Sequence, residues 1–197
     1  MTLDAPSVGA SDAAAQVLGS SPLMSRSRPP LQGFGKTRDT RKNSAFRLVG
    51  NVVLVVHNSV APTNDEWESY IKTVLRGGKL YGGDLTLCRQ LVLTDGGGPN
   101  SAQRAVAQKA AEQMGGAAMP VAVVSSSTFV RGIVTAFNWF NMNLRAFSPL
   151  EITKALSFLK VDALTIDAIW EELALVEAEI GPVETVRTIR ESYKNHS

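Results

Sequence analysis

The chain has 197 residues, a length that accommodates one domain with its own core plus appended segments. Its composition, 44% hydrophobic and 19% charged, is that of a globular protein, and a formal net charge of +2 is too small to indicate nucleic-acid binding. The single cysteine, Cys88, excludes an internal disulfide and a cysteine-based metal cluster. Two distant histidines provide no metal-ligand spacing, so we expect neither a metal nor a cofactor.

No stretch reaches the ~18 apolar residues of a membrane span, because Ser125–Thr128 and Arg131 interrupt the longest candidate. The first residues include an early aspartate and lack a basic start followed by an apolar run, unlike a secretory signal. The sequence therefore predicts a protein without a membrane span, and we expect it to be cytoplasmic.

Residues 1–44 are rich in Ser, Pro, Gly, Ala and Arg and show no sustained helical or strand period. Such a segment buries too little apolar surface to offset the entropy lost on ordering. We predict a disordered basic arm here, which either contacts an acidic partner or a membrane surface or is a solvated linker.

Strand and helix patterns alternate from residue 45 to residue 160. Apolar segments at 46–49 and 51–57 flank Gly50-Asn51, which predicts a hairpin whose second strand is covered on both faces. A capping box at Thr63–Glu66 opens a helix that we expect to end before Gly77-Gly78. The other predicted elements are a strand at 87–94, a helix at 101–114 with Ala105, Val106, Ala110 and Met114 facing inward, a strand at 120–124, a helix at 126–140, a strand at 144–147 and a helix at 152–159.

This order, β-β-α-β-α-β-α-β-α, predicts an α/β domain with a mixed sheet of about five strands and right-handed crossovers. Residues 161–197 form a C-terminal extension with two further amphipathic helices, at 165–179 and 183–194, separated by Gly181-Pro182. Their apolar faces must be buried either on the core domain or on a partner.

This element order, with a Gly-rich turn between the third strand and the second helix, resembles the STAS domain of anti-sigma-factor antagonists, stressosome proteins and sulfate transporters. The segments VVLVVHNSVAPTNDEWESYI, QLVLTDGGGPNSAQR, MPVAVVSSSTFVRGIVTAFNWF and RAFSPLEITKALSFLKV look like its divergent, uncharacterised bacterial branch. The resemblance covers residues 45–160. It implies a non-enzymatic regulatory or scaffolding module that acts by protein–protein contact or by self-association.

In the STAS family, the second helix begins with a serine, usually within Asp-Ser-Ser-Gly, whose phosphorylation switches partner binding. The turn here departs from that pattern, because three glycines follow Asp95 and the first serine is Ser101. A phosphate on Ser101 would lie at a helix N-terminus, where the helix dipole favours it. Alternatively, Ser101 or Asn100 only caps the helix.

Two polar turns at strand ends form the candidate binding rim. The Gly-rich turn opens a helix and could expose N–H groups to an anion, although it has neither a Walker loop nor a GxGxxG fingerprint. If the strands are parallel, both turns lie at one edge of the sheet. There they either bind a small anion, lipid or peptide or are ordinary strand-to-helix connections. The rim residues are Asp95, Gly96, Gly97, Gly98, Asn100, Ser101, Arg104, Ser126, Ser127, Thr128 and Arg131.

The leading hypothesis is thus an interaction module without enzymatic activity, and a small-molecule, anion or lipid-binding protein is the first alternative. A weak hydrolase with a Ser101–His57–Asp95 set is the second alternative. That set lacks a nucleophile elbow.

Overall fold

The computed structural model describes residues 41–113, 119–137 and 143–194. Most of the predicted N-terminal arm lies outside these ranges; within them, Lys42 forms an ion pair with Glu179 and Ser44 begins the first strand.

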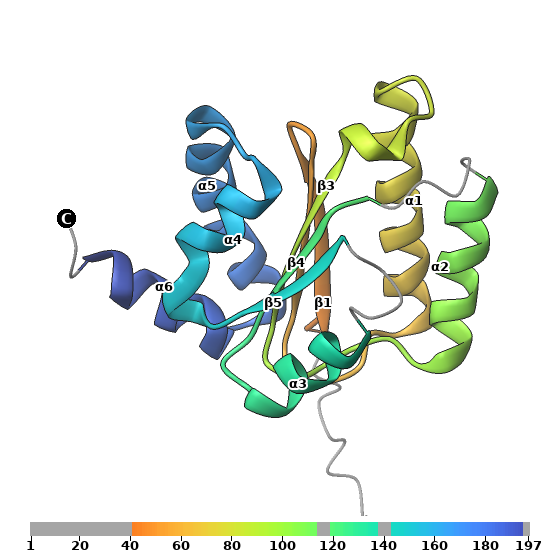
Figure 1. Cartoon of the computed structure of the whole chain (residues 1–197). Coiled ribbons are helices and arrows are strands. Elements are labelled where there is room, and N and C mark those ends of the chain that lie inside the picture. The colour runs from red at the N-terminus through yellow and green to blue at the C-terminus, as the bar shows by residue number, and fades with distance from the viewer. Residues whose placement is uncertain (1–40, 114–118, 138–142, 195–197) are drawn as a thin grey trace, which may run out of the picture. The chain divides into compact units, whose positions relative to one another are not determined.

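A five-stranded mixed sheet forms the centre of the described part of the chain, as the α/β prediction requires (Figure 1). The strand order is β1-β2-β3-β4-β5, with β1 antiparallel to β2 and the other neighbours parallel. The strands are β1 (Ser44–Val49), β2 (Val52–His57), β3 (Arg89–Thr94), β4 (Val121–Val124) and β5 (Leu144–Phe147).

Six α-helices and two short 3₁₀ helices are described around the sheet. The α-helices are α1 (Asn64–Leu80), α2 (Ser101–Gln113), α3 (Thr128–Phe137), α4 (Ile152–Leu159), α5 (Ala163–Ile180) and α6 (Glu184–Lys194), and the 3₁₀ helices are η1 (Leu85–Leu87) and η2 (Pro149–Glu151). None of these described helices is long and apolar enough to cross a bilayer.

The predicted hairpin is present, with Gly50 at φ 56° in the two-residue turn between β1 and β2. Every residue of β2 is buried, as expected of a strand covered on both faces. The capping box that opens α1 is also present, since Thr63 and Glu66 satisfy each other's main-chain N–H groups.

The C-terminal helices pack on the sheet. Ile169 and Leu173 of α5 and Ile189 of α6 are fully buried in one cluster with Leu54 and Leu91 of the central strands. Helices α4, α5 and α6 therefore cover one face of the sheet, while α1, α2 and α3 lie on the other side (Figure 1). Of the two alternatives for their apolar faces, burial on the core domain is the one observed.

Helix α1 was predicted to end before Gly77-Gly78, and this prediction is wrong, because α1 continues to Leu80. Both glycines are buried inside the helix. A Cβ built on Gly77 would lie 3.4 Å from a methyl group of Leu48 and 3.5 Å from the sulfur of Cys88, which are ordinary van der Waals distances. Helix α1 thus packs directly on the hairpin at Gly77.

The predicted orientation of α2 is wrong as well. Ala105 and Val106 are exposed, Ala110 is half-buried, and Gln103 is the buried residue among those described in this helix. Met114 lies outside the described residues. Helix α2 packs beside α1 (Figure 1) and does not bury an apolar stripe on the strands. Within the described ranges, no helix consequently lies directly on the stretch of sheet between α1 and α3.

Candidate functional site

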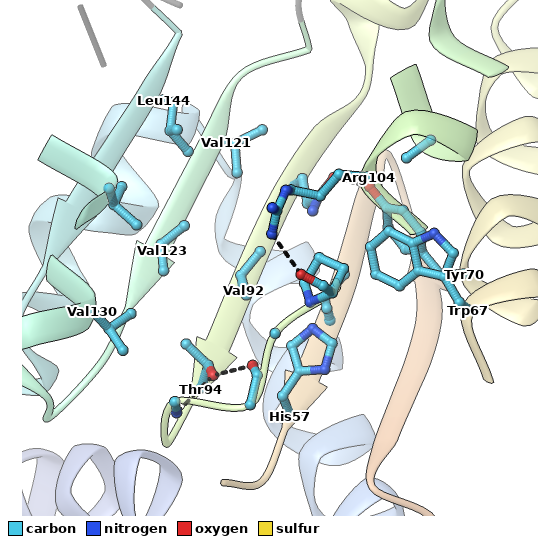
Figure 2. A pocket seen from close by; sticks show the side chains of 18 residues that line it. His57, Trp67, Tyr70, Val92, Thr94, Arg104, Val121, Val123, Val130 and Leu144 are labelled. Atoms are coloured by element: carbon cyan, nitrogen blue, oxygen red, sulfur yellow. Dashed lines mark hydrogen bonds between the residues drawn. The ribbon is translucent and has the colours of Figure 1, made fainter. Parts of the chain in front are cut away.

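A pocket of about 570 Å³ lies over this stretch of the sheet (Figure 2). This volume is within the usual range for small-molecule sites, ~300–1,000 Å³. The strands supply Val55, His57, Gln90, Val92, Thr94, Val121, Val123 and Leu144, the helices supply Trp67, Tyr70, Arg104, Ala107, Val130 and Val134, and the Gly-rich turn supplies Gly96, Gly97, Gly98 and Pro99.

The pocket has two chemically different sides. In Figure 2, Val121, Val123, Val130 and Leu144 form an aliphatic group on one side, and His57, Trp67, Tyr70 and Arg104 lie on the other. This separation follows from the fold, because β4, β5 and α3 contribute only apolar side chains, whereas α1, α2 and the end of β2 contribute aromatic and polar ones. Such a site suits a ligand with an apolar body and a polar end.

Two hydrogen bonds fix the aromatic side. The indole Nε1 of Trp67 donates to the carbonyl oxygen of Gln103 at 2.6 Å, which ties α1 to the first turn of α2. The hydroxyl of Tyr70 donates to Oε1 of Gln90 at 3.0 Å. Burial raises the pKa of Tyr70 to about 12, with the Gln90 hydrogen bond acting in the opposite direction, so this phenol is uncharged at neutral pH.

His57 ends β2 and is 3% exposed, and its buried Nδ1 has no hydrogen-bond partner among the described residues. Burial lowers the pKa of His57 to about 4, although the charge of Glu66 acts against this shift. The imidazole is therefore neutral at pH 7. It contacts Phe46 in an edge-to-face arrangement with ring centroids 5.9 Å apart.

Ser44 lies directly opposite His57 in the β1–β2 ladder, and its buried hydroxyl likewise has no partner in the part of the chain that the structure describes. Since the Asn58 N–H donates to the Asn43 carbonyl one position further on, Ser44 and His57 form a non-hydrogen-bonded pair, the kind whose side chains are closer. Two unsatisfied polar atoms thus occur at one position of the sheet, beside the pocket wall that His57 provides.

Two glycines of the turn, Gly96 and Gly97, are required by its backbone. A Cβ on Gly97 would lie 2.3 Å from the carbonyl oxygen of Val60 and 2.4 Å from that of Asn58, and Gly96 has φ 122°. The Gly97 N–H donates to the Asn58 carbonyl at 2.9 Å, and the Gly96 N–H donates to the Thr94 hydroxyl at 3.0 Å. Both N–H groups therefore have acceptors within the chain. The turn forms a wall of the pocket, and these two N–H groups are not available to bind an anion.

Both predicted turns do lie at the same edge of the sheet, since β3 and β4 are parallel. Helix α6 begins there. The Asp95 carboxylate accepts the N–H groups of Glu184 at 2.7 Å and Thr185 at 2.8 Å. The buried Thr185 hydroxyl donates to the Thr94 carbonyl at 3.0 Å and lies 3.2 Å from the Ser126 N–H, which donates to it.

The structure brings together only part of the predicted rim. Gly96, Gly97, Gly98 and Arg104 line the pocket. Asp95 and Ser126 hold α6, and the Arg131 guanidinium donates to the carbonyl groups of Ser125 and Ser126. Ser127 caps α3 through the Val130 N–H, and Thr128 is an exposed residue at the start of that helix.

At the start of α2, Asn100 is the cap. Its Oδ1 accepts the Gln103 N–H at 2.9 Å, and Oε1 of Gln103 accepts the Asn100 N–H at 3.0 Å. Ser101 is the exposed first residue of the helix. For the hydrolase alternative, Asp95 is bonded to α6 and His57 Nδ1 has no partner, so these three residues form no hydrogen-bonded set.

The sequence patterns did not indicate Trp67, Tyr70, Gln90 or the strand valines as site residues. One signal was present, because Gln90, Thr94 and His57 are polar residues in otherwise apolar strands. In the described ranges, no group of His, Cys, Asp and Glu could hold a metal ion. Comparison of the whole chain with protein-family models, curated proteins and solved structures found no match. The resemblance to the STAS family therefore stays a prediction.

Proposed function

We propose that this protein binds a small, mainly apolar molecule in the pocket between α1, α2 and α3. The observation that carries this proposal is a pocket of about 570 Å³ whose walls are largely apolar, with a few polar groups on one side. Proteins seldom leave such a hollow over a central sheet, because close packing of the same valines by a helix would be more stable. A ligand would supply the contacts that α2 does not.

The experiment uses N-phenyl-1-naphthylamine, a neutral apolar fluorophore whose emission rises in an apolar site. We expect saturable binding of one equivalent. Ala107 lines the pocket from α2, so Ala107→Phe should fill part of the volume and abolish binding. Ala105 is exposed on the same helix and does not line the pocket, so Ala105→Phe is the matched control and should bind as the wild type does.

Binding that is equal in the two variants would show that the probe occupies another surface, and the proposal would then fail. Native mass spectrometry of the freshly purified protein provides a second test. A non-covalent adduct that is present in wild-type protein and absent from Ala107→Phe would identify the natural ligand by mass.

A second candidate, a regulatory partner switch, is favoured by one observation: Ser101 is exposed at the N-terminal end of α2 while Asn100 occupies the cap position. The Ser101 hydroxyl is accessible to a kinase. A phosphate added to it would be stabilised by the helix dipole without displacing the cap. Affinity capture from native cytosol with intact-mass measurement tests it. The switch is supported if a stoichiometric protein partner is captured and its binding changes when the bait gains roughly 80 Da, the mass added by one phosphate, at Ser101. It is excluded if no such partner is captured and Ser101→Ala behaves as the wild type does.

A further inference from the structure

We infer that the ligand of this pocket is an amphipathic anion whose negative group pairs with Arg104. This inference rests on the proposed ligand-binding function and adds the chemical class of the ligand. Among the 18 described residues that line the pocket, Arg104 is the one with a charge at neutral pH, because His57 and Tyr70 are neutral there. No aspartate or glutamate is among these residues, so nothing in the lining neutralises the arginine.

The backbone and the turn hold Arg104 over the pocket. Its N–H donates to the Asn100 carbonyl at 3.0 Å, in the first turn of α2. Its side chain reaches back toward the Gly-rich turn, where Nη1 donates to the Pro99 carbonyl at 2.7 Å (Figure 2). This hydrogen bond orients the exposed guanidinium before a ligand arrives, which lowers the entropy lost on binding.

Most of the donor capacity of this guanidinium is unused. An arginine side chain has five N–H donors, and within the described ranges the Pro99 carbonyl is its hydrogen-bond acceptor. A carboxylate or sulfonate can accept two parallel hydrogen bonds from the remaining N–H groups of the guanidinium. Such charge-assisted pairs are among the strongest hydrogen bonds in proteins. A neutral ligand would leave these donors to solvent.

The body of the ligand must be apolar. Facing Arg104 across the pocket in Figure 2 are the side chains of Val121, Val123 and Leu144, and the described residues there provide no polar side chain. The Tyr70 hydroxyl is already bonded to Gln90 and the Trp67 indole N–H to the Gln103 carbonyl. An aliphatic or aromatic monoanion therefore matches the lining, whereas a polyanion such as a nucleotide would place charge against the valines.

Two probes with the same ring system, one neutral and one anionic, test the inference. The neutral probe is N-phenyl-1-naphthylamine, and the anionic probe is 8-anilinonaphthalene-1-sulfonate, which adds one sulfonate to the same ring system. Arg104→Gln removes the positive charge from the pocket. We expect it to weaken sulfonate binding about tenfold or more, in line with loss of a charge-assisted hydrogen-bonded pair, and to change the affinity of the neutral probe less than about twofold.

Lys109→Gln is the matched control, because Lys109 is an exposed residue of the same helix and does not line the pocket. It should leave both affinities unchanged. Arg104→Lys keeps the charge without the planar fork and should give an intermediate sulfonate affinity. Unchanged binding of the neutral probe to Arg104→Gln also demonstrates that the variant is folded.

Equal effects of Arg104→Gln on both probes, or no effect on either, would overturn the anionic class while the ligand-binding function stands. Equal effects of Lys109→Gln and Arg104→Gln on the sulfonate would overturn it too, because the sulfonate would then respond to the general charge of the helix. Failure of the neutral probe to bind wild-type protein would instead overturn the proposed function itself.

Discussion

Asp95, directly after β3, caps helix α6, which begins 89 residues later at Glu184, and its Oδ1 accepts the N–H of Thr185 at 2.8 Å. Oδ2 of the same carboxylate accepts the N–H of Glu184 at 2.7 Å. The first N–H groups of a helix have no partner within the helix, and an acidic side chain both bonds to them and suits the dipole. This one residue therefore connects the C-terminal helix to the strand whose following turn lines the pocket.

We predict that Asp95→Ala lowers the free energy of unfolding by about 1–2 kcal/mol, the usual cost of losing a helix cap. Asp95→Asn should cost less, because the amide oxygen still accepts one of the two N–H groups. Urea unfolding followed by circular dichroism measures both. Asp167, exposed on α5, provides the control, and the prediction is contradicted if Asp167→Ala is as destabilising as Asp95→Ala.

Gly97 and Gly98 are neighbours with opposite requirements. A Cβ on Gly97 would lie 2.3 Å from a main-chain oxygen, a contact that no rotamer relieves, whereas a Cβ on Gly98 meets nothing within 4 Å. We expect Gly97→Ala to destabilise the fold by about 3 kcal/mol or more and Gly98→Ala to change stability by less than about 0.5 kcal/mol. Thermal and urea denaturation of the pair test this, and similar stabilities would mean that the turn is not held against residues 58–60.

Most of the element order was predictable, because it depends on local signals. The apolar run of β2, the turn at Gly50 and the capping box at Thr63 each act within a few residues. The parallel pairing of β3 and β4, and hence the common edge of both polar turns, followed from the strand–helix–strand order.

The site depends on long-range packing and could not be predicted in the same way. Helix α2 is rich in alanine and its apolar residues define no strong stripe, so the sequence does not specify whether it lies on the sheet or beside α1. Its observed position decides that a pocket exists and that Arg104 lines it. Similarly, the bonds from Asp95 to α6 could not be anticipated from a turn motif, because their partners are 89 and 90 residues away.

Asn100 and Ser101 are a further matched pair. Asn100 forms reciprocal hydrogen bonds with Gln103 and caps α2, while the Ser101 side chain is exposed. Asn100→Ala should therefore cost about 1 kcal/mol and Ser101→Ala less than about 0.5 kcal/mol in urea unfolding. The reverse order would indicate that Ser101 is the cap, and the serine would then be less available for modification.

His57 should make stability depend on pH. Its pKa is lowered to about 4 by burial, against an ordinary value of 6.5 that the unfolded chain regains. Between these values the unfolded chain binds a proton that the folded chain does not, so acidification favours unfolding. We expect the contribution of His57 to be absent above pH 6.5 and to destabilise the fold progressively down to pH 4, by roughly 3 kcal/mol in total.

The variant His57→Gln isolates this effect, because all other titrating groups remain. Urea unfolding of wild type and variant at pH 4, 5, 6 and 7 gives the difference in unfolding free energy, which should shift in favour of the variant as the pH falls. A difference that is constant across this range would mean that His57 is protonated as readily in the folded chain as in the unfolded one. The ring would then have a solvent contact or a hydrogen-bond partner, and the pocket wall beside Ser44 would be open to water.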